Sequence, residues 1–218
     1  MKKIFQIMKV EYDEDGNYKL KIILVGESGV GKTNLINIMQ GKDFDKHEET
    51  TSSCSYFMTE VIIENIHFNI YLWDTIGQER LRAQTKIFFK NSKIVILVYD
   101  ITNRFSFTNL EEWNKLIKEN LGDDIVLGVL GNKKDLFMQE KVNEEEAESY
   151  ANSINAKWSL GSAKTERQGF IDYIGELIRI YIKQANITSE NKEELERQES
   201  IKLDSAPQNI KNKKKCCK

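Results

Sequence analysis

Short apolar runs alternate along the chain with segments in which apolar residues recur at helical spacing. Helical spacing appears in residues 107–121 and 170–181, and Asn143 followed by Glu146 predicts the capped start of another helix. The continuously apolar runs are typical of strands buried on both faces of a sheet: residues 20–26 (LKIILVG), 93–100 (KIVILVYD) and 124–132 (DIVLGVLGN). This alternation predicts an α/β domain with helices on both faces of a mostly parallel sheet.

Residues 60–74 (EVIIENIHFNIYLWD) follow a different pattern. Apolar and polar residues alternate there as in a strand with one buried face, and the alternation is interrupted near Glu64 and Asn65. A hairpin that turns at this point adds one antiparallel strand at the edge of the otherwise parallel sheet.

The two ends of the chain differ from its central part. Residues 1–17 lack the cleavage site of a signal peptide, so we expect an N-terminal extension there. Apolar periodicity ends near Gln184, and residues 185–218 contain few aromatic or branched core residues. The predicted organisation is therefore one domain at residues 18–184, followed by a flexible tail.

Charge and cysteine content narrow the classes of function. The chain has 32 Lys and Arg residues against 34 Asp and Glu residues, a balance that predicts no nucleic-acid partner. Its three cysteines are Cys54 and an adjacent pair near the C-terminus, which is not a disulfide framework. This cysteine usage suits a reducing compartment.

Residues 26–33 (GESGVGKT) match a phosphate-binding loop, G-x-x-x-x-G-K-T, between a predicted strand and a predicted helix. Lys32 supplies a positive charge for the outer phosphates, and Thr33 supplies a hydroxyl group for Mg²⁺. Three glycines let the loop turn its N–H groups inward: Gly26, Gly29 and Gly31. The remaining predicted contacts of this loop are Ser28, Val30 and Asn34.

Residues 131–135 (GNKKD) follow another buried strand, where an α/β sheet binds its ligands. The Asp135 carboxylate can accept hydrogen bonds from the N1–H and the amine of guanine, which adenine does not offer. Asn132 can support the loop, and the aliphatic part of Lys133 can cover one face of the base. This motif favours guanine recognition over an ATPase or a small kinase.

A third motif, residues 73–80 (WDTIGQER), ends the second strand of the hairpin. Asp74 is placed to hold Mg²⁺ through water, as a second acidic residue does in phosphate-loop enzymes. Gly77 can donate its N–H to a γ-phosphate, and Gln78 can orient the attacking water. The motif predicts hydrolysis that depends on positioning and charge stabilisation.

Together these motifs resemble the small GTPases of the Ras superfamily, and further segments of residues 18–184 resemble the Rab family. These segments are LVYDIT (97–102), SFTNLEEW (106–113) and GSAK (161–164). The resemblance implies a phosphate-loop small G domain with a six-stranded, mostly parallel sheet. It also implies further contacts: Phe44 packed on the base, Ala163 bound to it through its backbone, Ser162 and Lys164 in support, and Thr51 on Mg²⁺.

The sequence departs from the Rab pattern at both expected switch segments. Thr51 is followed by SSCSY, and Ile76 stands where the family has alanine. One hypothesis is that Ile76 alters the motion of the second switch and the placement of Gln78; the alternative is that it packs outward. The aromatic trio that faces effectors in the family corresponds to Tyr56, Trp73 and Phe88.

The leading prediction is a GTP-hydrolysing switch that recruits trafficking effectors in its GTP form, with Mg²⁺ as cofactor and GTP or GDP as ligand. The alternative is a GTP-loaded interaction module with negligible intrinsic hydrolysis. No arginine is obviously placed to act on the γ-phosphate, so intrinsic turnover should be slow. The resemblance implies a monomeric G domain whose partners are an exchange factor, a GTPase-activating protein, effectors, and the Rab escort and prenylation machinery.

The C-terminus, KNKKKCCK (211–218), combines a lysine run with a cysteine pair. The Rab resemblance implies that Cys216 and Cys217 accept geranylgeranyl groups, and two such chains would anchor the protein stably. Lys215 occupies the fourth position from the end, which excludes a C-a-a-X box. Lys218 after the pair leaves single and double prenylation open. We therefore expect the protein at the cytoplasmic face of endomembranes, cycling with the cytosol.

Overall fold

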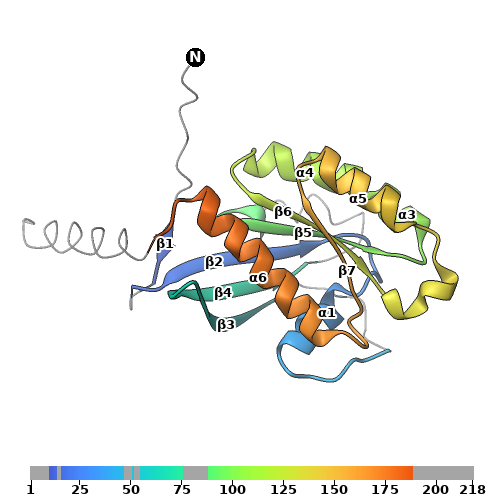
Figure 1. Ribbon diagram of the computed structural model, residues 1–218, viewed down its shortest axis with the longest axis horizontal. Coiled ribbons are helices and arrows are strands. Elements are labelled where there is room, and N and C mark those ends of the chain that lie inside the picture. The colour runs from blue at the N-terminus through green and yellow to red at the C-terminus, as the bar shows by residue number, and fades with distance from the viewer. Residues whose placement is uncertain (1–9, 14–15, 47–50, 52–54, 76–87, 189–218) are drawn as a thin grey trace, which may run out of the picture. The chain divides into compact units, whose positions relative to one another are not determined.

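The computed structural model describes the following residues: 10–13, 16–46, 51, 55–75 and 88–188. The chain divides into two units, Met1–Asn186 and Ile187–Lys218. The elements and the site described below belong to the first unit (Figure 1).

One sheet lies at the centre of this unit, and within the described residues it has seven strands. Six of them follow the order β3-β4-β2-β5-β6-β7, and β1 pairs with β2 off this path. All strand pairs are parallel except β1–β2 and β3–β4. The predicted α/β fold with a mostly parallel sheet is therefore confirmed. The strands are β1 Glu11–Tyr12, β2 Tyr18–Val25, β3 Ser55–Ile63, β4 Ile66–Asp74, β5 Ile94–Asp100, β6 Val126–Asn132 and β7 Lys157–Leu160.

The sheet has one strand more than the six predicted because of β1. This strand comes from the N-terminal extension and runs antiparallel to the start of β2, with Glu11 opposite Lys19 and Tyr12 opposite Tyr18. The rings of Tyr12 and Tyr18 lie with their centroids 4.8 Å apart. The extension thus contributes both hydrogen bonds and aromatic packing to the domain.

Strands β3 and β4 form the predicted hairpin. Their pairing runs from Ser55 opposite Asp74 to Ile63 opposite Ile66. Glu64 and Asn65 join them with φ angles of 54° and 62°, the left-handed conformation that a two-residue hairpin turn needs at both positions. The hairpin places β3 at the edge of the sheet and Asp74 at the end of β4.

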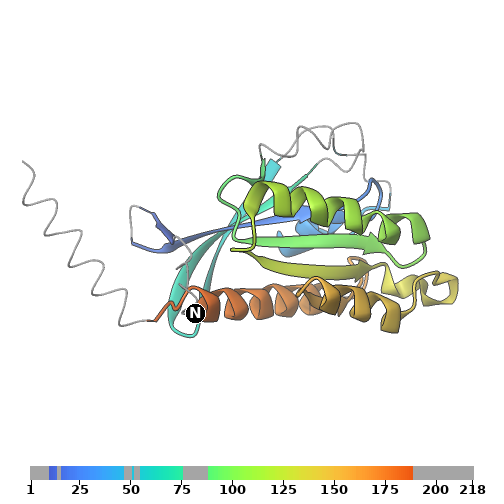
Figure 2. The ribbon, with the colours of Figure 1, turned by 90° about the horizontal axis from the view of Figure 1, so that it is seen from above.

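Helices cover both faces of the sheet, as predicted. The helices α4 (Leu110–Leu121) and α5 (Glu144–Ser153) contribute buried residues to the core on one face. On the other face lies α6 (Arg167–Gln184), where the Tyr173 hydroxyl donates to the carbonyl of Val129 at 3.2 Å. Figure 2 shows α4 and α6 on opposite sides of the sheet. The other helical segments described are α1 Lys32–Met39, α3 Arg104–Thr108 and the 3₁₀ helix η2 Lys134–Gln139.

Asparagine side chains cap the N-termini of two of these helices. The Asn143 side chain accepts a hydrogen bond from the Glu146 N–H at 2.8 Å, which confirms the predicted cap of α5. The Asn103 side chain does the same for the Phe105 N–H at 3.1 Å and begins α3. Both caps satisfy backbone donors that have no partner inside the helix.

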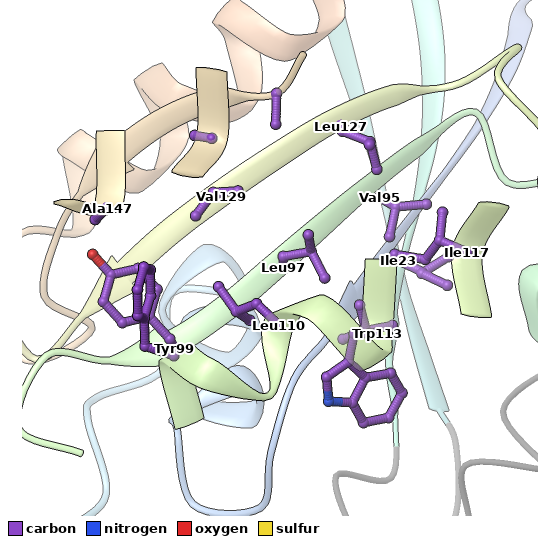
Figure 3. Close-up of a cluster of buried hydrophobic side chains, with 14 of the residues drawn as sticks. Ile23, Val95, Leu97, Tyr99, Leu110, Trp113, Ile117, Leu127, Val129 and Ala147 are labelled. Atoms are coloured by element: carbon purple, nitrogen blue, oxygen red, sulfur yellow. The ribbon is translucent and has the colours of Figure 1, made fainter. Parts of the chain in front are cut away.

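The core under α4 and α5 is built from alternate residues of the central strands. Trp113, in the segment 107–121 of helical spacing, is 0% exposed and lies in this core. Tyr181 of α6 is also buried, on the other face of the sheet. Figure 3 shows how α4 and α5 meet the strands in a cluster that includes Ile23, Val95, Leu97, Tyr99, Leu110, Trp113, Ile117, Leu127, Val129 and Ala147.

The carboxyl ends of the parallel strands β2, β4, β5 and β6 meet at one edge of the sheet. The segments that follow them begin at Gly26, Thr75, Ile101 and Lys133. Ligands of α/β proteins bind outside these strand ends, so the fold brings the described residues of the three sequence motifs to the same place.

Candidate functional site

A cavity of about 400 Å³ opens at this edge of the sheet. Of the predicted site residues, the following line its walls: Ser28, Gly29, Gly31, Lys32, Thr33, Asn34, Phe44, Thr51, Asn132, Lys133, Asp135, Ala163 and Lys164. Four further residues that the sequence did not predict also line it: Asp45, Lys46, Thr75 and Leu136.

The loop between β2 and α1 lies unusually close to its neighbours. Gly26 has a φ of 147°, and a Cβ atom there would lie 2.1 Å from the carbonyl oxygen of Val98. Gly31 has a φ of 96°, and a Cβ atom there would lie 2.4 Å from Nδ2 of Asn132. Side chains are excluded at both positions for steric and conformational reasons. The Lys32 ammonium donates to the carbonyls of Gly26 at 2.8 Å and Glu27 at 2.9 Å, so the loop wraps around it.

Two threonine hydroxyls and one carboxylate meet at the end of β4. The hydroxyls of Thr33 and Thr51 lie 2.8 Å apart, and each donates to Oδ2 of Asp74, at 2.8 and 3.2 Å. Thr51 thus lies beside the other two residues expected at Mg²⁺; Thr50, which precedes it, lies outside the described residues.

Asp74 is 3% exposed, and its Oδ1 has no hydrogen-bond partner among the described residues. Burial raises the pKa of the Asp74 carboxyl above its usual value, against the opposing effects of the Thr33 hydroxyl and the Lys32 charge. A buried carboxylate oxygen without a partner, beside two hydroxyl oxygens, fits the oxygen ligands that Mg²⁺ prefers.

The Asn132 side chain joins two of the loops around the cavity. Its Nδ2 donates to the carbonyl of Val30 at 2.8 Å, and its Oδ1 accepts the Ala163 N–H at 3.0 Å. Val30 therefore contributes a carbonyl to the loop contacts and does not line the cavity. Asn132 is 1% exposed, so both bonds are shielded from water.

Asp135 is held by the loop that follows β7. Its Oδ1 accepts a hydrogen bond from the Ser162 hydroxyl at 2.6 Å, and the Lys164 ammonium lies 3.9 Å from its Oδ2. Ser162 itself accepts the Lys164 N–H at 3.1 Å. The predicted supporting residues thus orient the Asp135 carboxylate at the wall of the cavity.

Lys133 has a partner that the sequence did not predict. It adopts a left-handed conformation with a φ of 67°, and its ammonium lies 2.7 Å from Oδ2 of Asp100. The other carboxylate oxygen of Asp100 accepts the Thr102 N–H at 2.8 Å and the Thr102 hydroxyl at 2.7 Å. Asp100 lies directly opposite Asn132 in the β5–β6 register. A carboxylate at the end of an apolar strand was the available signal.

Asn34 lines the cavity, but its side-chain amide forms hydrogen bonds with the backbone of the protein itself. Its Nδ2 donates to the carbonyl of Asp45 at 2.9 Å, and its Oδ1 accepts the Asp45 N–H at 3.0 Å. These bonds brace the segment that carries Phe44, whose ring lines the cavity and is 37% exposed. Asn34 therefore positions the predicted base-packing residue.

The three predicted effector-facing aromatic residues also come together. The ring centroids of Tyr56 and Trp73 lie 5.1 Å apart, and those of Trp73 and Phe88 lie 5.9 Å apart. The Lys21 ammonium lies 4.3 Å from the Trp73 centroid, on the same surface. Tyr56 is 56% exposed, which leaves its ring open to a partner.

Several sequence predictions concern residues outside the described ranges. They are Ile76, Gly77, Gln78, Cys216 and Cys217.

Comparison with known proteins places this site in a family. The Ras family model matches residues 21–183. The chain belongs to the Ras family. Among its relatives, Ras-related protein Rab-21 of Homo sapiens is 39% identical over 171 residues, which cover 78% of this chain and 75% of that protein. GTP-binding protein ypt3 of Schizosaccharomyces pombe is 32% identical and covers 77% and 80%, and Ras-related protein RABA1e of Arabidopsis thaliana is 32% identical and covers 79% and 81%. This Ras-family chain is thus a Rab-type small GTPase.

The Asp100–Lys133 pair yields a first prediction for this GTPase. Asp100→Asn keeps an oxygen acceptor for Thr102 but removes the charge that holds Lys133. We expect bound GDP to dissociate about tenfold faster, measured with a fluorescent GDP analogue, because a charged hydrogen bond is lost beside the base.

The control is Glu166→Gln. The Glu166 carboxylate forms an exposed ion pair, at 3.0 Å, with Lys134, the residue that follows Lys133. Exposed pairs contribute little, so its dissociation rate should stay close to that of the wild type. Equal rates for Asp100→Asn and the wild type would contradict the assignment.

Proposed function

We propose that this chain is a Rab-type switch that binds GTP or GDP with Mg²⁺ and hydrolyses GTP slowly on its own. The observation that carries the proposal is the convergence of described residues from all three motifs on one cavity. The Asn132 bonds to Val30 and Ala163 join the loop expected to bind phosphate to the loops expected to bind guanine. A single nucleotide could therefore contact both sets of loops.

Recognition of the base rests on Asp135. Its carboxylate accepts a bond from Ser162, and Lys164 lies near its other oxygen, so its orientation is set before a ligand arrives. A preorganised carboxylate favours a base with two adjacent donors, which guanine has and adenine lacks. Lys133, held by Asp100, and Phe44 supply the apolar surfaces for the two faces of the ring.

Mg²⁺ would be held by Thr33, Thr51 and Asp74. When bound, the ion neutralises charge on the outer phosphates. Thr33 belongs to the loop that receives the phosphates, whereas Thr51 lies 18 residues later in a separate segment. A hydroxyl that comes from outside that loop is suited to report whether the γ-phosphate is present. Effectors would bind the GTP form through Tyr56, Trp73 and Phe88.

Hydrolysis would depend on Gln78 to orient water and on Gly77 to bind the γ-phosphate. The residues that line the cavity in the described part of the chain include no arginine. Of the lysines that line it, Lys32 is the one that belongs to the loop expected to bind the phosphates. We infer that a GTPase-activating protein supplies further positive charge in trans and an exchange factor releases GDP.

Single-turnover hydrolysis tests this activity. GTP-loaded wild-type protein should release phosphate slowly, and a cell extract that contains activating proteins should accelerate it. Gln78→Leu should abolish the slow intrinsic release, while Glu166→Gln serves as a folded control. No phosphate release from the wild type under either condition would contradict the switch and support a GTP-loaded interaction module instead.

The tail would anchor this monomeric G domain to the cytoplasmic face of endomembranes, between periods in the cytosol. Among the described residues, no helix is both long and apolar enough to cross a membrane. We propose that Cys216 and Cys217 carry geranylgeranyl groups added by the Rab escort and prenylation machinery.

Mass spectrometry of the protein from a eukaryotic host tests the lipid anchor. We expect a C-terminal peptide with added geranylgeranyl mass, lost in Cys216→Ser/Cys217→Ser. An unmodified cysteine pair in the membrane fraction would contradict the proposed anchor.

A further inference from the structure

Glu27 places a buried carboxylate inside the loop expected to bind phosphates. It is 6% exposed, and it does not line the cavity. Its Oε1 accepts a hydrogen bond at 3.1 Å from the indole N–H of Trp113, a residue 86 positions later in α4. Figure 3 shows Trp113 at the end of the core cluster opposite Ala147.

The same residue also holds the lysine of the loop. The backbone carbonyl of Glu27 accepts the Lys32 ammonium at 2.9 Å, next to the Gly26 carbonyl at 2.8 Å. Glu27 thus joins the core of the domain, through its side chain, to Lys32, through its backbone. Gly26 is fixed independently, because its backbone packs against Val98 with no room for a Cβ atom.

A carboxylate at this position needs a structural reason. Negative charge near phosphate groups opposes their binding, and a buried carboxylate is costly unless it is hydrogen-bonded. The Trp113 N–H lowers that cost and holds the charge on the side of the loop away from the cavity. Trp113 is 0% exposed and packed in the core, so it offers a rigid donor.

We propose that Glu27 is a positioning residue of the nucleotide site: the Trp113 indole fixes its side chain, and its backbone carbonyl thereby fixes the Lys32 ammonium. This inference rests on the proposed guanine-nucleotide binding. In it, the contact between Glu27 and Trp113 orders the part of the site that binds the phosphates. Glu27 itself does not touch the nucleotide.

The proposal can be tested because positioning of Lys32 and simple electrostatics predict opposite changes in the rate of GDP release when Glu27 is replaced. Removing a negative charge near the phosphates should, by electrostatics alone, slow the release of GDP. If Glu27 acts by positioning Lys32, Glu27→Ala should instead release GDP faster, by about tenfold, because a buried hydrogen bond to a charged group is lost. The measurement is the dissociation rate of a fluorescent GDP analogue from the full-length protein with Mg²⁺.

Matched variants separate positioning from general packing. Trp113→Phe keeps an aromatic ring but loses the donor, and it should accelerate release to a similar extent. The Glu27→Ala/Trp113→Phe double variant should be no faster than the faster single variant, because both remove one bond. Glu27→Gln keeps an acceptor oxygen and should remain within about twofold of the wild type. Trp158→Phe removes the indole that donates to the Tyr99 hydroxyl at 3.5 Å, away from the loop, and should leave the rate unchanged.

The indole N–H signal of Trp113 in NMR spectra gives a second readout that holds even if Trp113→Phe does not fold. In Glu27→Gln it should keep the slow solvent exchange of a hydrogen-bonded donor. In Glu27→Ala the signal should shift and exchange faster. The proposal is overturned if Glu27→Ala releases GDP at or below the wild-type rate, or if Glu27→Gln is as impaired as Glu27→Ala. A wild-type protein that binds no guanine nucleotide would overturn the proposed function itself.

Discussion

The side-chain amide of Asn132 is the constraint on which the rest of the site depends. It stands at the end of β6, donates to the carbonyl of Val30 and accepts the N–H of Ala163. Gly31 must lack a side chain because its backbone lies against this same amide. The loops that contain Val30, Asn132 and Ala163 are thereby held together. Loss of either bond would leave a buried polar group unsatisfied, which costs about 1–3 kcal/mol.

Around this amide, the two ends of the cavity are ordered by different forces. At the end expected to hold the base, hydrogen bonds and an ion pair orient the side chains. The Asp135 carboxylate accepts a hydrogen bond from Ser162, and the Asp100 carboxylate pairs with Lys133. At the other end, Asp74 keeps one buried oxygen without a partner among the described residues. A buried carboxylate oxygen of this kind suits a cation as ligand. With Mg²⁺ at this proposed site, binding of a nucleotide and binding of Mg²⁺ should depend on one another.

The sequence allowed the motifs and the α/β fold to be predicted because each depends on local spacing or on a short apolar run. Thr51 lies beside Thr33 and Asp74, and its expected role on Mg²⁺, which came only from the resemblance to a family, stays a prediction. The contacts of Asp100 and Glu27 could not be predicted, because an acidic residue does not indicate its partner in the sequence, and the partner of Glu27 lies 86 positions away. Strand β1 is too short to produce an alternation. The fold was therefore more predictable than the contacts that orient the site.

Selectivity between nucleotides is the most direct test of guanine recognition by Asp135. A fluorescent GDP analogue is bound to the wild-type protein with Mg²⁺, and unlabelled GTP, GDP or ATP is added as competitor. We expect displacement by equimolar GTP or GDP and none by a large excess of ATP, because Asp135 selects adjacent donors on the base. Displacement by ATP as effective as that by GTP would contradict it.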